Sequence, residues 1–298
     1  MTLNFSETEV FTLLHKSSNS NKIEIVIPVR NEEQRLKYLI EGLRDNFKLI
    51  FLDGGSTDNT VELIKSYDCD VYLRNDPKYY GVQTNPLAQS IFDAQNGTSW
   101  CMAYYINNIS EADFILRLWA DEYINKIDQI KIISYLKTTG GNIKSNRADW
   151  LYGHRIGSPT KYIISYRPGE AVWDDKVLHS DILSLSNEKN FITVEVEQFC
   201  LNDTAAQIVK ISKYTKAEIL RITKNKKFKY PSVGYRYGLM ILSPFKHYRR
   251  YPTFKLFFIT FLWQLMDCLI GHIIYFEMFY LNNNEVQNNI YEKYVKEN

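Results

Sequence analysis

The feature that most constrains the fold of this chain is an alternation of strand-like and helix-like segments between residues 22 and 74. Apolar runs rich in β-branched residues are separated by segments whose apolar side chains recur at helical spacing. The runs are residues 22–29, 48–53 and 70–74, and the helical segments are residues 31–46 and 59–68. This order predicts parallel strands joined by right-handed crossovers. We therefore expect an α/β fold with a mixed, mostly parallel sheet flanked by helices.

Each helical segment follows a residue type that favours a helix start. Asn31 precedes two acids, and Asp58 precedes the second segment. Asparagine and aspartate side chains accept hydrogen bonds from the first amides of a helix, and acids there interact well with its dipole. We expect Asn31 to be an N-cap, and we assign Asp58 mainly to capping rather than to a ligand.

Changes in composition and in hydrophobic pattern divide the rest of the chain. Residues 1–20 are polar and rich in Ser and Asn, which indicates a flexible leader. Residues 112–124 predict a strand that leaves the sheet at Ala120–Glu122, and residues 126–137 predict a helix. Short alternating runs between residues 149 and 199 indicate antiparallel strands. After residue 203 the chain is helical and basic, so we expect one domain over residues 21–200 and a helical extension over 201–298.

Bulk composition excludes several protein classes. The chain is 45% hydrophobic and 23% charged, as is usual for a soluble globular protein. Its four cysteines form no C-x-x-C pair, so neither a disulfide framework nor a zinc site is indicated, and a reducing cytoplasm fits best. No G-x-G-x-x-G follows the first strand and no P-loop motif is present, which argues against a nicotinamide dinucleotide.

The C-terminal third is strongly basic in one part and apolar in another. Between Lys210 and Lys255 the chain carries thirteen lysines and arginines but one acid, Glu218. This block indicates either an anionic partner, such as a phosphorylated ligand or a lipid surface, or a solvated basic face. Residues 256–281 are long enough to span a bilayer but contain polar and charged residues. We prefer a buried or interfacial helix in peripheral contact with an anionic membrane, and we expect no nucleic acid partner.

Polar segments follow the predicted strands at the end where ligands bind. In an open parallel sheet the ligand lies at the carboxyl ends of the strands. These ends read "PVRNEE", "LDGGSTD" and "WADE". Gly54 and Gly55 allow a ligand to approach the backbone, and amides at the following helix start favour negative charge. The three segments therefore predict one crevice for a phosphorylated ligand.

These residues also carry a resemblance to a known family. "IEIVIPVRNEEQRLKYLIEGL" followed by "KLIFLDGGSTDNTVELIKSY" resembles the opening of inverting family 2 glycosyltransferases. Downstream, "ILRLWADEYI" resembles the family's D-A-D-E strand end. "YRPGEAVWDDKVLHSD" and "LMDCLIGH" are similar to segments of the branch that builds lipopolysaccharide core and capsule sugars. The resemblance covers most of residues 22–280.

The resemblance implies a GT-A fold, the nucleotide-diphospho-sugar transferase fold, in the domain over residues 21–200. Residues 21–124 would form the nucleotide-sugar-binding half and residues 125–200 the acceptor half. The implied activity is transfer of a sugar, with inversion, from a nucleotide-diphosphate sugar to a glycan or lipid-linked glycan acceptor. Lipopolysaccharide, capsule or a related bacterial surface glycan would be extended in the cytoplasm, at the inner face of the membrane. A divalent cation, Mg²⁺ or Mn²⁺, is implied as cofactor.

The family's site residues carry over by position. Asp181 is the first candidate for the catalytic base and Glu122 another, with Asp175 between them in rank; Asp121 and His179 are candidate metal ligands. The candidate nucleotide-sugar contacts are Pro28, Val29, Arg30, Asn31, Glu32, Asp53, Gly54, Trp119 and Ala120. For Asp53 the residues leave open an aspartate that only caps its turn, for Arg30 a solvent-facing side chain, and for His179 a structural role.

Two departures from the family pattern affect the predicted chemistry. Trp119 replaces the first aspartate of the D-x-D triplet, and Gly54 replaces the second acid of the usual V-D-D. The Trp119 indole either stacks on the donor or packs in the core. These departures keep a second hypothesis open, a catalytically degenerate sugar-nucleotide binder in a glycan assembly complex. A nucleotidyltransferase is less favoured because "PVRNEE" has no glycine.

Overall fold

The computed structural model describes most of the first two thirds of the chain. The described residues are 10–75, 98–151, 154–173, 182–185, 190–199 and the single positions 238, 241, 242, 245, 261, 265, 268 and 269. The chain divides into two compact units, residues 1–200 and 201–298. Almost all of the second unit lies outside the described residues.

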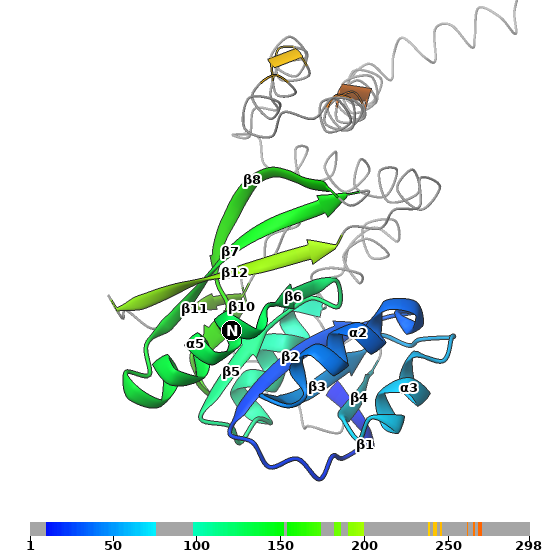
Figure 1. The fold of residues 1–298 in the computed structure, drawn as a ribbon. Coiled ribbons are helices and arrows are strands. Elements are labelled where there is room, and N and C mark those ends of the chain that lie inside the picture. Colours follow the sequence, from blue (N-terminus) through cyan, green and yellow to red (C-terminus); the bar gives the residue numbers. More distant parts are fainter. Residues whose placement is uncertain are drawn as a thin grey trace, which may run out of the picture. The chain divides into compact units, whose positions relative to one another are not determined.

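The main sheet of the first unit has six strands in the order β1-β4-β3-β2-β5-β9 (Figure 1). Strands β4, β3, β2 and β5 run parallel, whereas β1 and β9 pair antiparallel at the two edges. The strands are β1 (Phe11–His15), β2 (Ile23–Val29), β3 (Lys48–Asp53), β4 (Asp70–Arg74), β5 (Phe114–Arg117) and β9 (Ser165–Tyr166). The predicted mixed, mostly parallel sheet is therefore confirmed.

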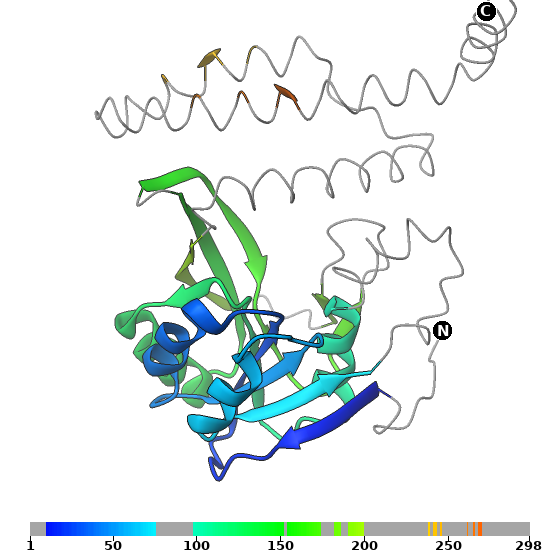
Figure 2. The same ribbon diagram turned by 90° about the vertical axis from the view of Figure 1, so that its right-hand side faces the viewer.

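Helices cover both faces of this sheet (Figures 1 and 2). Helix α2 (Glu33–Leu43) connects β2 to β3, and α3 (Thr60–Ser66) connects β3 to β4. Both pack into one core cluster with α5 (Lys126–Thr138), while the helical residues 98–108 pack into a second cluster. In β2, Ile23, Ile25, Ile27 and Val29 belong to the first cluster and Val26 to the second. Because both faces of β2 are buried, its sequence is apolar apart from Glu24.

A second sheet has the order β6-β12-β7-β8, and a separate pair joins β10 to β11. The strands are β6 (Glu122–Ile124), β7 (Asn142–Leu151), β8 (His154–Ile163), β10 (Ala171–Trp173), β11 (Ile182–Ser184) and β12 (Phe191–Phe199). Strand β7 pairs antiparallel with β8, as the sequence predicts, but parallel with β12. The expectation of antiparallel strands over residues 149–199 is therefore wrong for the pair of β12 with β7, although β12 pairs antiparallel with β6. Alternation within a strand carries no information on its partner's direction.

The predicted flexible leader is wrong for its second half. Residues 11–15 form strand β1, which pairs with β4 from Phe11 opposite Arg74 to His15 opposite Val71. Phe11 is buried, and its ring meets the Tyr72 ring edge-on at 5.9 Å between centroids. This tertiary contact orders a segment whose polar surroundings suggest a loop. Residues 1–9 lie outside the described part.

The predictions for the C-terminal third fall almost entirely outside the described residues. The eight positions described after residue 237 are helical, with Cys268 buried and Leu269 exposed. The basic block at residues 210–255 and the apolar segment at 256–281 are otherwise not described. Within the described residues, no helix has both the length and the apolar character needed to cross a membrane.

Candidate functional site

The carboxyl ends of β2, β3 and β5 lie at one edge of the main sheet (Figure 1). Val29, the last residue of β2, is paired with Asp53, the last residue of β3. On the other side of β2, Arg117 is paired with Val26, and the amide of Leu118 donates to the Val26 carbonyl at 3.2 Å. The chain after β5 therefore leaves the sheet on the same side as the Asp53 turn.

The Asp53 carboxylate holds together the turn that follows β3. Asp53 is only 2% exposed and accepts hydrogen bonds from the Gly55 amide at 3.0 Å and the Ser56 hydroxyl at 2.5 Å. The Ser56 amide donates to both carboxylate oxygens. These contacts agree with the alternative in which Asp53 only caps its turn, because both carboxylate oxygens accept hydrogen bonds from residues of that turn. Gly55 has a φ of +83°, a conformation that favours glycine.

The loop after β2 is bonded to the loop after β3. Asn31, with a φ of +57°, donates its amide to the Ser56 hydroxyl at 3.0 Å and accepts from the Thr57 amide at 2.8 Å. The Glu32 amide donates to the Thr60 hydroxyl at 2.8 Å. Asn31 is therefore not the N-cap of α2; Glu32 occupies that position. The Asn31 side chain is used instead to fasten the two loops.

Asp58 bonds the first residue of both neighbouring helices. Its carboxylate accepts from the Thr60 amide at 3.0 Å and the Thr60 hydroxyl at 2.5 Å, and from the Glu33 amide at 3.3 Å. Desolvation opposes ionisation, but the hydrogen bonds from Thr60 and Glu33 hold the pKa of Asp58 below its ordinary value. The helix-start role expected for Asp58 is thus met by these bonds, although the formal N-cap of α3 is Asn59.

The other residues after β2 that are predicted to contact the nucleotide-sugar differ in their solvent exposure and in their bonds to other side chains. Val29 is buried, Pro28 is half-buried, and the Arg30 side chain is exposed. Glu32 forms an ion pair with Arg35, in which guanidinium Nη2 donates to Oε1 at 2.9 Å and Nε contacts Oε2. Among these residues, Arg30 is the charged side chain that faces solvent. A ligand at this edge would therefore meet Arg30 before it met Glu32.

Residues 119–122 form a tight turn at the position of the D-x-D triplet. The Glu122 amide donates to the Trp119 carbonyl at 2.9 Å, and the Trp119 amide donates to Glu122 Oε2 at 3.0 Å. The Trp119 side chain is half-buried against the second core cluster, and Ala120 is 8% exposed. Of the two roles considered for the Trp119 indole, the described structure therefore shows packing against the core.

Glu122 is buried inside this turn. It is 0% exposed, and its Oε1 accepts from the Tyr162 hydroxyl at 2.6 Å and lies 3.5 Å from Arg147 Nη1. The Arg117 guanidinium stands 4.6 Å from the centre of the Tyr162 ring. Burial raises the pKa of Glu122, although the Tyr162 hydrogen bond and the Arg117 charge oppose that rise. Such a carboxylate fastens the turn to the second sheet.

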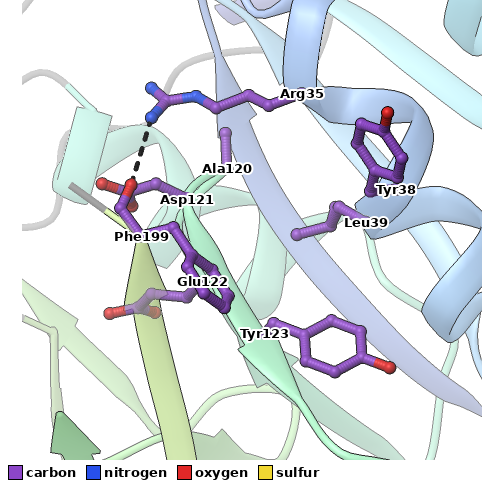
Figure 3. A pocket seen from close by; sticks show the side chains of 8 residues that line it. All are labelled: Arg35, Tyr38, Leu39, Ala120, Asp121, Glu122, Tyr123 and Phe199. Carbon is purple, nitrogen blue, oxygen red and sulfur yellow. Dashed lines mark hydrogen bonds between the residues drawn. The ribbon is translucent and has the colours of Figure 1, made fainter. Parts of the chain in front are cut away.

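Asp121 is one of the residues that line a cavity of about 500 Å³ (Figure 3). The Gln198 side chain donates to Asp121 Oδ2 at 3.1 Å, and the Phe199 amide donates to the Asp121 carbonyl at 2.8 Å. The cavity is lined by Arg35, Tyr38, Leu39, Ala120, Asp121, Glu122, Tyr123 and Phe199. The sequence analysis missed the aromatic residues and Arg35. No sequence signal marks them, because they come from α2, β6 and the far end of β12.

The described residues fit a cation only in a limited way. They contain no group of three His, Cys, Asp or Glu side chains able to hold a metal ion. Asp121 nevertheless keeps Oδ1 without a hydrogen bond in the described part, since Gln198 engages Oδ2. One carboxylate suffices for Mg²⁺ when ligand phosphates supply other oxygens. The predicted residues His179 and Asp181, and the lower-ranked Asp175, lie outside the described residues.

The described part of the chain is an α/β fold in which the turns after β2, β3 and β5 gather at the carboxyl edge of a mostly parallel sheet. Residues 24–85 match the family model of glycosyl transferase family 2. This segment includes β2, α2, β3, α3 and β4, and the match agrees with the resemblance predicted from the sequence.

Curated relatives give a more distant similarity. An undecaprenyl-phosphate 4-deoxy-4-formamido-L-arabinose transferase of Yersinia pestis (strain Pestoides F) is 26% identical over 164 residues, which is 51% of this chain and 46% of that protein. The protein of the same name from Yersinia enterocolitica is 24% identical over 172 residues, covering 54% and 48%. The chain thus spans about half the length of the curated relatives it matches.

Solved structures resemble part of the chain at low similarity. TarS of S. aureus gives a TM-score of 0.32 at 16% identity and covers 46% of this chain and 38% of that one. Glucosyl-3-phosphoglycerate synthase from Mycobacterium tuberculosis, in complex with Mn²⁺ and UDP-glucose, gives a TM-score of 0.31 at 19% identity, covering 45% of each chain. These TM-scores are too low to establish a shared fold or ligand.

Proposed function

We propose that the protein is a glycosyltransferase that moves a sugar, with inversion, from a nucleotide-diphosphate sugar to a glycan or lipid-linked glycan acceptor. The supporting observation is that the family 2 segment supplies the Asp53 turn, while the turn carrying Asp121 leaves β5 at the same edge of the sheet. This edge is where ligands of parallel α/β sheets bind.

The donor nucleotide would lie against the loops that follow β2 and β3. Asp53 holds the Gly54–Gly55 turn in shape, so its contribution is to present backbone rather than to bond the ligand directly. The exposed Arg30 guanidinium would pair with a phosphate or stack on the base. Pro28, Val29 and Asn31 would supply backbone contacts, and Trp119 and Ala120 would border the sugar.

A divalent cation, Mg²⁺ or Mn²⁺, would be held by Asp121 together with diphosphate oxygens, and His179 is the proposed further ligand. When bound, the ion would offset the negative charge that develops on the leaving diphosphate. The carboxylate of Asp121 is kept in place by Gln198 and by the backbone bond to Phe199. This chain would therefore contribute one well-oriented oxygen and rely on the donor for others.

The proposed base is Asp181, which would take the proton of the acceptor hydroxyl as the oxygen attacks the anomeric carbon. Glu122, the other candidate, is better suited to positioning. Although Glu122 borders the cavity, it is 0% exposed, and its carboxylate is already bonded to the Trp119 amide and the Tyr162 hydroxyl. We therefore assign Glu122 to holding the turn that carries Asp121.

The proposed acceptor class is supported by the names of the curated relatives and by the charge of the C-terminal third. Those relatives are named for undecaprenyl phosphate, a lipid phosphate. The basic block between Lys210 and Lys255 suits an anionic membrane surface. We propose that the protein acts in the cytoplasm at the inner face of the membrane, on lipopolysaccharide, capsule or a related surface glycan.

The test is donor hydrolysis and transfer with UDP- and GDP-sugars, with and without Mn²⁺. Asp121→Asn is expected to lower turnover on the order of 100-fold, because it removes the charged ligand beside the diphosphate. Asp113→Asn is the matched control, since Asp113 is an exposed acid just before the amino end of β5. Turnover that is indifferent to both Mn²⁺ and Asp121→Asn would contradict the metal assignment.

A second candidate, a catalytically degenerate sugar-nucleotide binder, is favoured by one observation. Trp119 stands where the family has an acid, and its indole packs partly in the core. Calorimetric binding of a sugar nucleotide without turnover of any donor, in the presence of Mn²⁺, would support this candidate and contradict the transferase.

A further inference from the structure

The cavity beside Asp121 has an unusual lining of surface aromatic rings (Figure 3). Tyr38 on α2 is 73% exposed and Phe199 at the end of β12 is 49% exposed, while Tyr123 on β6 is half-buried. Leu39 forms part of the wall. Such rings combine an apolar face with, in tyrosine, a polar edge, and they contact ligands with little loss of conformational entropy.

The charged groups around the cavity already have partners. Arg35 donates to both carboxylate oxygens of Glu32 and, at 3.5 Å, to the Phe199 carbonyl. Glu122 is neutralised by its bonds to Tyr162 and its ion pair with Arg147. Among the described residues, the lining therefore offers no cation free to bind a phosphate. Tyr38 is 73% exposed, and Phe199 is 49% exposed although its ring is stacked on Trp150.

We propose that this cavity is an acceptor subsite that binds a neutral saccharide, with a ring face against Tyr38 and Phe199 and hydroxyl groups towards Asp121. This inference rests on the proposed transferase function and adds the chemical class of the group bound beside the reaction site. A volume of about 500 Å³ is within the range of small-molecule sites. A sugar ring matches the lining, since its C–H face is apolar and its edge carries hydroxyl donors for a carboxylate.

The cavity lies beside the proposed donor site. Asp121 belongs both to the turn that faces the proposed donor and to the cavity wall. A saccharide held on Tyr38 and Phe199 would present a hydroxyl next to the proposed donor site, which lowers the entropic cost of bringing two substrates together. The ion pair between Arg35 and Glu32 would fix the wall nearest the donor loops.

The test uses saturation-transfer NMR on the full chain with four neutral disaccharides: lactose, maltose, cellobiose and N,N′-diacetylchitobiose. Titration should give a Tyr38-dependent signal on ring protons of at least one sugar. Tyr38→Ala and Phe199→Ala are each expected to weaken binding about three- to tenfold, the effect of losing one ring contact. Tyr38→Phe keeps the ring and should bind like the wild type.

Ile127→Ala is the matched control, because Ile127 is an apolar side chain of α5 that is 80% exposed and does not line the cavity. It should leave the sugar signal unchanged. Absence of signal from all four sugars, or a signal that Tyr38→Ala leaves intact, would overturn the proposal. Tyr38-dependent binding of farnesyl phosphate without sugar binding would also overturn it, in favour of a lipid chain.

Binding of UDP and of GDP, each with Mn²⁺, is measured in the same samples to separate the two proposals. Loss of the nucleotide signal in Asp121→Asn, together with sugar binding that depends on Tyr38, supports both. Tyr38-dependent sugar binding without binding of either nucleotide would leave the saccharide subsite standing and contradict the transferase. Nucleotide binding without sugar binding would do the reverse.

Discussion

The two edges of the main sheet use charged residues in opposite ways. At the amino ends of β2, β3 and β4, Lys48 Nζ lies 3.1 Å from Glu24 Oε1 and 3.3 Å from Asp70 Oδ2, and all three side chains are buried. The hydroxyls of Tyr105 and Ser110 donate to the other Glu24 oxygen at 3.1 and 2.6 Å. Burial and the Glu24 charge raise the pKa of Tyr105, so it stays a neutral donor.

At the carboxyl edge, Asp53 and Asp58 bond amides and hydroxyls of the loops rather than cations. The Arg30 side chain remains exposed. The amino edge is therefore a closed network that excludes solvent, whereas the carboxyl edge is rigid but open. The difference indicates that a ligand site at this sheet edge needs two things. The loops must be held in place, and at least one charged side chain, here Arg30, must have no ion-pair partner in the described part.

The largest expected effect comes from breaking the closed network. Lys48→Met removes the cation shared by Glu24 and Asp70 and leaves two buried carboxylates without it. We expect a loss of about 3–5 kcal/mol in the free energy of unfolding, measured by urea denaturation. Lys65→Met is the control, because Lys65 pairs with the exposed Glu62, and an exposed pair contributes about 1 kcal/mol or less. Equal losses of unfolding free energy in Lys48→Met and Lys65→Met would contradict the view that the amino edge depends on a buried charge network.

Glu122 tests whether a buried acid at the open edge acts in chemistry or in structure. Glu122→Gln retains an oxygen acceptor and the shape of the side chain, so a positioning residue should keep turnover within about tenfold of the wild type. A general base should lose about 100-fold or more. Glu122→Ala strands the Tyr162 hydroxyl and should cost about 1–3 kcal/mol of stability, measured by thermal unfolding. A drop in turnover for Glu122→Gln as large as that for Asp181→Asn would contradict the positioning role.

The strands and helices between residues 22 and 74, and the helix after residue 125, were predictable because each has a strong local pattern. β3 spans the predicted residues 48–53, and α5 spans Lys126–Thr138 against a predicted 126–137. What the sequence could not give depends on distant partners. Strand β1 is ordered by β4, and the parallel pairing of β12 with β7 is set by tertiary packing.

The site shows the same division. The turns at Asp53 and Asp121 follow strand ends and are visible as motifs, so their common edge could be predicted. The cavity could not, since Arg35 and Phe199 are 164 residues apart in the chain and meet only in the fold. The use of Asn31 as a bridge to Thr57, rather than as a helix cap, likewise depends on the neighbouring loop.

Gly54 and Gly55 allow two properties of the carboxyl edge to be tested separately. Gly55 tests the backbone conformation of the turn, and Gly54 tests how closely a ligand approaches the backbone. Gly55 has a φ of +83°, so Gly55→Ala should cost about 1–2 kcal/mol in unfolding free energy through backbone strain. A Cβ at Gly54 would meet the Val29 carbonyl at 3.5 Å and Arg30 side-chain atoms at 3.7 Å, which are ordinary contacts. Gly54→Ala should therefore stay within about 0.5 kcal/mol of the wild type.

If the donor approaches this backbone, Gly54→Ala should still weaken UDP binding, measured by calorimetry. Stability and UDP affinity both unchanged in Gly54→Ala would place the donor elsewhere. Stability unchanged in Gly55→Ala would mean that the turn does not require its left-handed residue, and the rigidity attributed to the open edge would be wrong.

The smallest effect concerns Asp68, an exposed acid beyond the closed network that ties the β1 side of the sheet to the turn before β4. Hydrogen bonds from the Ser18 hydroxyl, from His15 and from the Ser18 amide lower the pKa of Asp68 from 3.8 to about 2. Because its folded-state pKa lies below the unfolded value, Asp68 stabilises the fold above pH 3.8, and this contribution is lost as the pH falls towards 2. Asp68→Asn should therefore flatten the dependence of unfolding free energy on pH in that window, whereas Asp113→Asn should not. An unchanged slope in Asp68→Asn would show that exposed pairs at this edge contribute nothing, leaving the buried Lys48 network as its whole electrostatic support.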